Sequence, residues 1–254
     1  LQFFGGEALI ERDLVFQAMD YGLQRSAELG KTLRFILSSN GWTLTPERIK
    51  ELSAYPVKLE LSLDGDSKTQ NAQRRALKKG ADSYDNSVSG RAEWVLQSGL
   101  EHEVIMVVHP EYAHRLFENF FHIAGLGYKQ IQINFALGFL WTEEQQRSFA
   151  KALHLIGAEL KNRWAAGDSI QLINLLEAPV PMRLNGEVTV DYDGTIYGGN
   201  GFLHETEHKS QFVAGHLRDG THFDRHWLDI PANDVLLSWS YPELKLNYIH
   251  HRSL

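Results

Sequence analysis

The chain has 254 residues, of which 43% are hydrophobic and 22% are charged, a balance typical of a globular protein. Its formal net charge of −7 argues against a nucleic-acid partner, because nucleic-acid-binding surfaces are normally basic. No apolar run approaches the roughly 20 residues that cross a bilayer, and no signal segment is visible, so we expect a cytoplasmic protein without a membrane partner. The chain contains no cysteine, which excludes disulfides, thiolate catalysis and cysteine-bound metals or clusters within these residues.

The first predicted strand, residues 1–4, leads directly into Gly5-Gly6-Glu7. Adjacent glycines allow positive φ angles and bring bare backbone close to a ligand, although an ordinary strand-to-helix turn has the same composition. The chain begins with Leu1, not methionine, inside this strand. We therefore expect it to be a fragment, a processed chain or the ordered part of a longer protein.

Strands and helices alternate through residues 1–165. The predicted strands are 1–4, 32–37, 57–63, 104–108 and 129–135, and the predicted helices are 7–29, 45–54, 88–100, 111–123 and 142–164. Between them, the polar stretch 66–86 is predicted to be a loop with a short helix over 71–78. Alternation with short connections predicts an α/β fold, with parallel strands joined by right-handed crossovers in a barrel, a half-barrel or an open sheet.

The pattern changes near residue 166, which divides the chain into a domain over 1–165 and a smaller C-terminal α+β region over 166–254. Residues 187–190 and 195–197 flank Asp193-Gly194, a strong hairpin signal. Short helices are predicted near 210–215 and 224–228.

A polar or glycine-containing segment follows each predicted strand of the first domain. Ligands of parallel α/β sheets and barrels bind at the carboxyl ends of the strands. One such segment is uninformative, but five in series on the same rim predict a single site. The five segments are Gly5-Gly6-Glu7, Ser38-Ser39-Asn40-Gly41, Asp64-Gly65, His109-Pro110 and Asn134.

These motifs, taken in order, resemble the radical S-adenosylmethionine (radical SAM) enzymes, in the branch with a SPASM-type C-terminal extension that includes peptide and protein maturases. The resemblance rests on F-F-G-G-E, L-S-S-N-G, L-E-L-S-L-D-G, K-K-G-A-D-S-Y-D, V-D-Y-D-G-T-I-Y and F-V-A-G-H-L. It implies a partial (β/α) barrel of parallel strands with a smaller C-terminal extension. It also implies S-adenosylmethionine as a cofactor.

Site residues are carried over position by position. Gly5, Gly6 and Glu7 match the turn that binds the methionyl amino group, and Ser39-Asn40-Gly41 match the family's T-N-G strand end. Ser62 and Asp64 match the serine and aspartate of S-L-D-G. Arg75 and Lys78, in the following loop, are candidates for the carboxylate of S-adenosylmethionine. The structural alternatives are turn-stabilising Asn and Asp side chains and solvated charges.

The chain departs from the family in its cysteines. The family holds a catalytic [4Fe-4S] cluster on three closely spaced cysteines before the Gly-Gly-Glu turn, so the ligands are expected upstream of Leu1. An auxiliary cluster is not expected, because Gly198-Gly199-Asn200 stands where the family usually has a cysteine. The implied reaction is reductive cleavage of S-adenosylmethionine, giving a 5′-deoxyadenosyl radical that modifies a peptide or protein. It needs a reductant, and this chain alone is expected to be inactive.

Three interpretations account for the missing cysteines. A longer parent chain supplies them, or a partner chain supplies them or covers the unpaired strand edge at residues 1–4. In the third, the protein is a degenerate, non-catalytic relative that binds a ligand or peptide or acts as a scaffold.

Two histidine patterns offer an alternative metal chemistry. His204 and His208 lie in an H-E-x-x-H segment, as in zinc proteases. No apolar helix surrounds this segment, which favours a polar surface turn. His222 and His226, with acidic residues nearby, are a second candidate pair of ligands.

Overall fold

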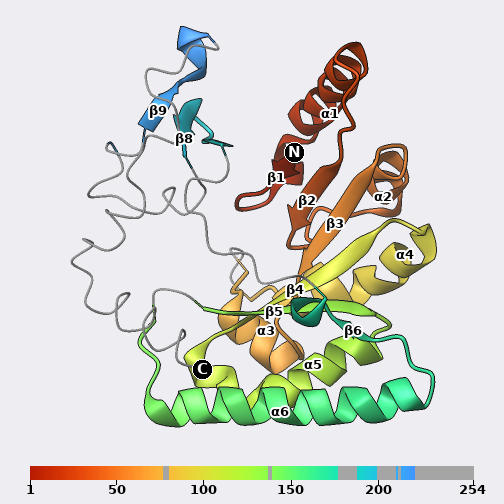
Figure 1. The fold of residues 1–254 in the computed structure, drawn as a ribbon, viewed down its shortest axis with the longest axis vertical. Helices are drawn as coiled ribbons and strands as arrows, with labels where there is room; N and C mark the ends of the chain where they lie inside the picture. Colours follow the sequence, from red (N-terminus) through yellow and green to blue (C-terminus); the bar gives the residue numbers. More distant parts are fainter. Residues whose placement is uncertain (77–79, 137–138, 177–187, 199–209, 211–212, 221–254) are drawn as a thin grey trace. The chain divides into compact units, whose positions relative to one another are not determined.

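The computed structural model describes residues 1–76, 80–136, 139–176, 188–198, 210 and 213–220. Contacts divide the chain into two units, Leu1–Glu177 and Ala178–Leu254. The first contains a parallel sheet with its helices, and the second contains a small antiparallel sheet (Figure 1). In the part of the chain that the structure describes, no helix is long and apolar enough to cross a membrane.

The first unit is built on six parallel strands that follow one another in sheet order as they do in the sequence. They are β1 (Gln2–Phe3), β2 (Phe35–Ser39), β3 (Val57–Ser62), β4 (His102–Val108), β5 (Gln130–Phe135) and β6 (Gln171–Leu172). Because every pair is parallel, all carboxyl ends lie at one edge of the sheet, here called the rim. The predicted α/β class and parallel sheet are confirmed.

Helices connect the strands. They are α1 (Arg12–Glu28), α2 (Pro46–Leu52), α3 (Ser67–Gln73), α4 (Gly90–Ser98), α5 (Leu116–Gly125) and α6 (Glu143–Ala165), with short turns η1 (Ala8–Glu11), η2 (Asp85–Ser89), η3 (Pro110–Arg115) and η4 (Ile173–Leu175). Two helix starts were readable from the sequence. Thr45 caps α2 ahead of Pro46, and Thr142 forms a capping box with Gln145 at α6.

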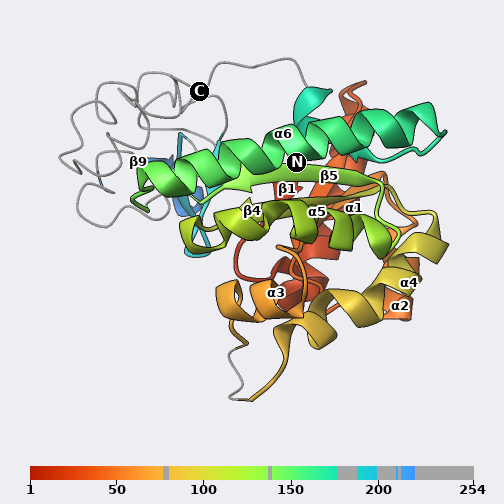
Figure 2. The ribbon, with the colours of Figure 1, turned by 90° about the horizontal axis from the view of Figure 1, so that it is seen from below.

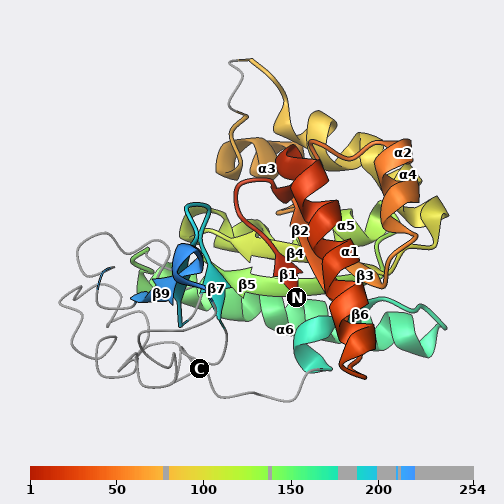
Figure 3. The ribbon, with the colours of Figure 1, turned by 90° about the horizontal axis from the view of Figure 1, so that it is seen from above.

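The helices cover one face of the sheet, and this face is apolar. Along β3, buried Val57, Leu59 and Leu61 alternate with half-buried Lys58, Glu60 and Ser62. The buried set belongs to one core with helix side chains such as Met19, Leu52, Val95, Phe120 and Leu160. Figure 2 shows α6 beside α5, and Figure 3 shows α1 and α2, which are joined by the Arg12–Glu51 ion pair.

The opposite face of the sheet is mainly polar. Strand register places Ile36, Ile105 and Val107 on it, among a larger number of polar side chains. We call these polar residues the polar face: Gln2, Ser38, Lys58, Glu60, Ser62, Glu103, Gln132 and Asn134. A parallel sheet that packs helices on both faces has near-continuous apolar strands. The alternation here therefore indicates that one face is kept for water or a ligand.

Several predicted elements need correction. The sheet has a sixth strand, β6, which the count of five missed because only two of its residues pair with β5. The short helix expected over 71–78 is α3, which begins at Ser67 after an Asp66 cap. The strand expected over 32–37 is β2, which begins and ends later, at Phe35 and Ser39.

In the second unit, the predicted hairpin is confirmed, since β7 (Thr189–Val190) and β8 (Thr195–Tyr197) pair antiparallel. The helix predicted near 210–215 is wrong, because Val213–His216 form strand β9, paired with β8 and followed by the turn η7 (Leu217–Asp219). The helix predicted over 224–228 lies outside the described residues.

Asn174 extends the pairing of β6 with β5 through its side chain. Its Oδ1 accepts from the Ile133 N–H at 2.8 Å, and its Nδ2 donates to the Ile133 carbonyl at 2.9 Å. We expect Asn174→Ala to lower the free energy of unfolding by about 1–2 kcal/mol, because both backbone groups of Ile133 lose their partner. Urea denaturation measures this. Asn162→Ala, at an exposed position of α6, is the control and should change little; equal effects of the two variants would contradict the assignment.

Candidate functional site

Glu7 joins the turn after β1 to the loop after β2. Its Oε2 accepts from the Asn40 backbone N–H at 2.9 Å, and its Oε1 accepts from Thr43 Oγ1 at 2.8 Å. The Ser39 hydroxyl lies 3.1 Å from both carboxylate oxygens. Hydrogen bonds to a carboxylate are stronger than those between neutral groups. Glu7 therefore holds the loop over residues 39–43 against the turn, and these contacts bring together three of the predicted site residues, Glu7, Ser39 and Asn40.

Asn40 stabilises the same loop from within. Its Oδ1 accepts from the Trp42 N–H at 2.9 Å, which forms an Asx-turn, and its Nδ2 lies 3.4 Å from the Gly6 carbonyl. The turn-stabilising role that the sequence offers as an alternative for Asn40 is thus present in the molecule. Ser39 is only 2% exposed and accepts from the Gly41 N–H at 3.0 Å. Ser39 and Asn40 therefore both lie on the rim and stabilise the backbone of its loop.

The glycines of the two segments have different surroundings. At Gly5 (φ +141°) and at Gly6, a Cβ atom would meet no heavy atom within 4 Å, so this backbone faces open space. At Gly41 (φ +82°), a Cβ atom would collide with the Ser87 carbonyl oxygen. Gly41 is therefore required for packing against η2, whereas Gly5-Gly6 leave backbone groups accessible to a ligand.

Asp64, at the end of β3, is 2% exposed and its carboxylate is occupied. Arg74 donates to it with Nε at 2.7 Å and with a terminal nitrogen at 2.9 Å, and the Val107 N–H donates at 3.0 Å. The Asp64 N–H donates to Gln70 Oε1 at 2.9 Å. Asp64 thus ties β3 to β4 and fixes a guanidinium at the rim.

The basic residue held at the rim is Arg74, which sequence reasoning missed. Arg75, its neighbour, is exposed and makes no ion pair within the described residues, while Lys78 lies outside them. Which of two adjacent arginines faces Asp64 depends on where α3 ends, and the structure ends it at Gln73. The sequence signal for this pair was the spacing of ten residues between Asp64, at the end of a strand, and Arg74. Such a spacing is too weak a signal to choose between Arg74 and Arg75.

Ser62 lies on the polar face at the last position of β3, beside Ile105 of β4. It is half-buried, and no other described residue makes a hydrogen bond to its hydroxyl. It therefore remains available to a ligand.

The loop that carries Arg74 is itself fixed. Asp66 caps α3 by accepting from the Thr69 N–H at 2.9 Å, and it pairs with Arg115 of η3. Burial raises the pKa of Asp66, but the hydrogen bonds from Thr69 and the charge of Arg115 outweigh it and leave the pKa below its ordinary value. Thr69 and Asn119, both 1% exposed, bond to each other behind the loop. The loop that carries Arg74 is therefore held in place by contacts with η3 and α5.

The remaining strand ends complete the rim. The His109 N–H donates to Gln73 Oε1 at 2.9 Å, and the His109 ring meets the Phe139 ring at 4.3 Å. Asn134, on β5, accepts from Gln132 at 3.1 Å. The parallel order places all five predicted segments at one edge of the sheet, as expected. Their roles as ligand contacts stay predictions.

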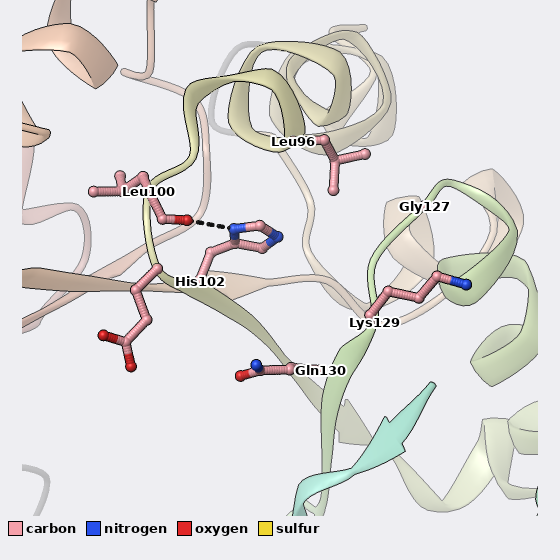
Figure 4. A pocket seen from close by; sticks show the side chains of 7 residues that line it. Leu96, Leu100, His102, Gly127, Lys129 and Gln130 are labelled. Atoms are coloured by element: carbon pink, nitrogen blue, oxygen red, sulfur yellow. Dashed lines mark hydrogen bonds between the residues drawn. The ribbon is translucent and has the colours of Figure 1, made fainter. Parts of the chain in front are cut away.

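A cavity of about 290 Å³ lies at the other edge of the sheet (Figure 4). It is lined by Leu96, Leu100, Glu101, His102, Gly127, Lys129 and Gln130. His102 and Gln130 are the first residues of β4 and β5, so the cavity is at the amino ends of the strands. His102 is held by its Nδ1, 2.7 Å from the Leu100 carbonyl oxygen. This cavity is therefore distinct from the predicted rim.

Metal ligands are not grouped in the part of the chain that the structure describes: no three His, Asp or Glu side chains there could hold an ion. The two histidine pairs, His204 with His208 and His222 with His226, lie outside the described residues. Metal binding by either pair stays a prediction.

No protein-family model and no curated protein matches the chain. Among solved structures, it is similar to anSMEcpe with bound AdoMet, with a TM-score of 0.73 and 19% identity over 94% of this chain and 69% of that one. For the complex of anSMEcpe with AdoMet and the Kp18Cys peptide, the TM-score is 0.73 and the identity is 19%, over 92% of this chain and 68% of that one. For SuiB of Streptococcus suis bound to S-adenosylmethionine, the TM-score is 0.57 and the identity is 11%, over 94% of this chain and 56% of that one.

The chain has the fold of these proteins. At such low identity the likeness concerns the fold alone, and it confirms the expected partial (β/α) barrel of parallel strands. The chain covers little more than half of SuiB and 60% of a second anSMEcpe structure with bound AdoMet.

Proposed function

We propose that this chain is the S-adenosylmethionine-binding part of a radical SAM protein that modifies a peptide or protein. The observation that carries the proposal is the open backbone at Gly5-Gly6, on a rim where Glu7, Ser39 and Asn40 converge. Structural neighbours with the same fold were solved with AdoMet bound, and one of them also with a peptide. The polar face below the rim supplies the surface that a peptide would contact.

The rim fits S-adenosylmethionine in its chemistry. Backbone groups at Gly5 and Gly6 would receive the methionyl ammonium, with the Glu7 carboxylate close behind. The free Ser62 hydroxyl and the guanidinium of Arg74, held by Asp64, would meet the hydroxyl and carboxylate groups of the ligand. Arg75 and Lys78 remain candidates for the same carboxylate. These residues would bind and orient the ligand.

The [4Fe-4S] cluster does not fit the residues present. Thiolates are the usual ligands of such clusters, and this chain has no cysteine. In this proposal the cluster, its reductant and the 5′-deoxyadenosyl radical would be supplied by a parent protein with ligands upstream of Leu1. A cluster-free SPASM-like extension and a cytoplasmic location form part of the same proposal, as does a partner chain at the edge of residues 1–4.

The absence of cysteine also favours a second candidate, a non-catalytic relative that binds a ligand or peptide. The residues encoded before Leu1 distinguish the two candidates. A C-x-x-x-C-x-x-C motif within a few tens of residues supports the enzyme, whereas a start codon at or just before Leu1 contradicts it.

Titration calorimetry with S-adenosylmethionine tests the site. We expect saturable binding with Kd below about 1 mM, equivalent to about −4 kcal/mol. Gly6→Val should weaken binding at least about tenfold without unfolding the chain, because its side chain fills open space that the ligand needs. Gly157→Val, also at an open position, is the matched control on α6. Absence of binding, or equal affinity of both variants, would contradict the proposal.

A further inference from the structure

Three side chains form a hydrogen-bonded row across β1, β2 and β3 on the polar face. The Ser38 hydroxyl donates to Glu60 Oε2 at 2.7 Å, and Gln2 Nε2 donates to the same oxygen at 3.2 Å. Gln2 Nε2 also lies 3.3 Å from the Ser38 hydroxyl. Both bonds reach Oε2, and no described residue donates to Oε1. The row therefore fixes the Glu60 carboxylate and leaves one of its oxygens available.

The charges on this face do not balance. Lys58 Nζ lies 2.5 Å from Oε2 of Glu103, a residue that is 3% exposed. The single lysine of the polar face is therefore already paired. Within the described residues no cation lies against Glu60; its two partners are neutral donors. A half-buried carboxylate without a counter-charge is unfavourable relative to one in water. The arrangement leaves one net negative charge on the face.

We propose that Glu60 binds the basic side chain, lysine or arginine, of a peptide lying against the polar face. The inference rests on the proposed function in taking the ligand to be a peptide. Glu60 and Ser62 are two residues apart on the same strand, so the basic group would sit roughly 7 Å below the rim. Gln132 and Asn134, on β5, offer amide groups to the peptide backbone on the same face. Glu60 is thus a specificity residue.

A peptide library tests this without knowledge of the natural substrate. The immobilised chain, saturated with S-adenosylmethionine, is panned against random nine-residue peptides with acetylated amino termini, so that lysine and arginine are the main cations. We expect these residues to be enriched about threefold or more over the input. Glu60→Gln should abolish the enrichment, and Glu60→Lys should replace it with enrichment of acidic residues.

The matched control is Glu118→Gln on α5, an exposed carboxylate on the helical side of the sheet. It removes the same charge from a chain of net charge −7, so it corrects for general attraction of cations. Enrichment that is absent from the wild type, that persists in Glu60→Gln, or that is lost equally in both variants overturns the inference.

Binding of S-adenosylmethionine separates this inference from the proposed function. We expect Glu60→Gln to keep its affinity for S-adenosylmethionine within about twofold. A matching loss of affinity would overturn the inference, since the carboxylate would then serve the cofactor. If the wild type shows Glu60-dependent enrichment without binding S-adenosylmethionine, the cofactor proposal fails while the role of Glu60 is supported.

Discussion

Glu7→Ala should weaken binding of S-adenosylmethionine about a hundredfold, a loss of about 2.7 kcal/mol. The carboxylate accepts hydrogen bonds from Ser39, Asn40 and Thr43, so its removal releases the loop from the turn at which we expect the ligand to bind. It also removes a negative charge close to the expected position of the methionyl ammonium. Titration calorimetry measures the affinity, and circular dichroism shows whether the variant is folded.

Two further variants separate the loop contacts from the charge. Thr43→Val deletes one donor to Glu7 and leaves its charge, so we expect a loss of no more than about tenfold. Glu28→Ala removes a carboxylate from the far end of α1, where it pairs with Arg25, and should leave affinity unchanged. Unchanged affinity in Glu7→Ala would remove this residue from the site. It would also show that the Glu7 contacts at the rim are not needed for binding of S-adenosylmethionine.

That the candidate site residues lie at one edge of the sheet was predictable, because it follows from hydrophobic periodicity and strand direction. Alternating strands and helices with short connections require parallel strands, and parallel strands bring their carboxyl ends to one edge. Gly5-Gly6-Glu7 and Ser39-Asn40 could therefore be placed together although more than thirty residues separate them. The helix starts at Thr45 and Thr142 were also predictable, because a helix cap and the first turn that it contacts lie within four residues of each other in the sequence.

What escaped prediction depends on contacts between distant residues. The short strand β6 is recognisable only through its pairing with β5 and through the side chain of Asn174. Strand β9 forms on β8, which overrides the local preference of residues 213–216. The role of Arg74 requires the end of α3 and the position of Asp64 together. In each case the deciding partner lies outside any local window of sequence.

The polar face was also beyond sequence reasoning, although its signal is present in the strands. Lys58, Glu60 and Ser62 alternate with leucines and valine, a period-two pattern that normally indicates a sheet with one solvated face. Only the register shows that Glu60 aligns with Ser38 on one side and Glu103 on the other. Alignment across three strands converts an ordinary alternation into a row of interacting polar groups with one unpaired charge.

Asp64→Ala should lower the free energy of unfolding by about 3–5 kcal/mol, a large share of the 5–15 kcal/mol typical of a domain. The substitution leaves the Arg74 guanidinium partly buried without its anion and deprives the Val107 N–H of its acceptor. Removing one partner of a buried pair exposes the full desolvation cost of the other. Urea denaturation followed by circular dichroism gives the free energy directly.

The control is Asp13→Ala, which breaks an ion pair with Arg12 in which the Asp13 side chain is 80% exposed. Such a pair contributes at most about 1 kcal/mol, so a similar loss in both variants would contradict the role given to Asp64. The double variant Asp64→Ala/Arg74→Met should recover part of the stability, because no unpaired charge remains. If Arg74 also contacts the ligand, that double variant stays weak for S-adenosylmethionine although it folds well. If stability recovers and affinity does not, Arg74 binds the ligand; if both recover, Arg74 has a structural role alone.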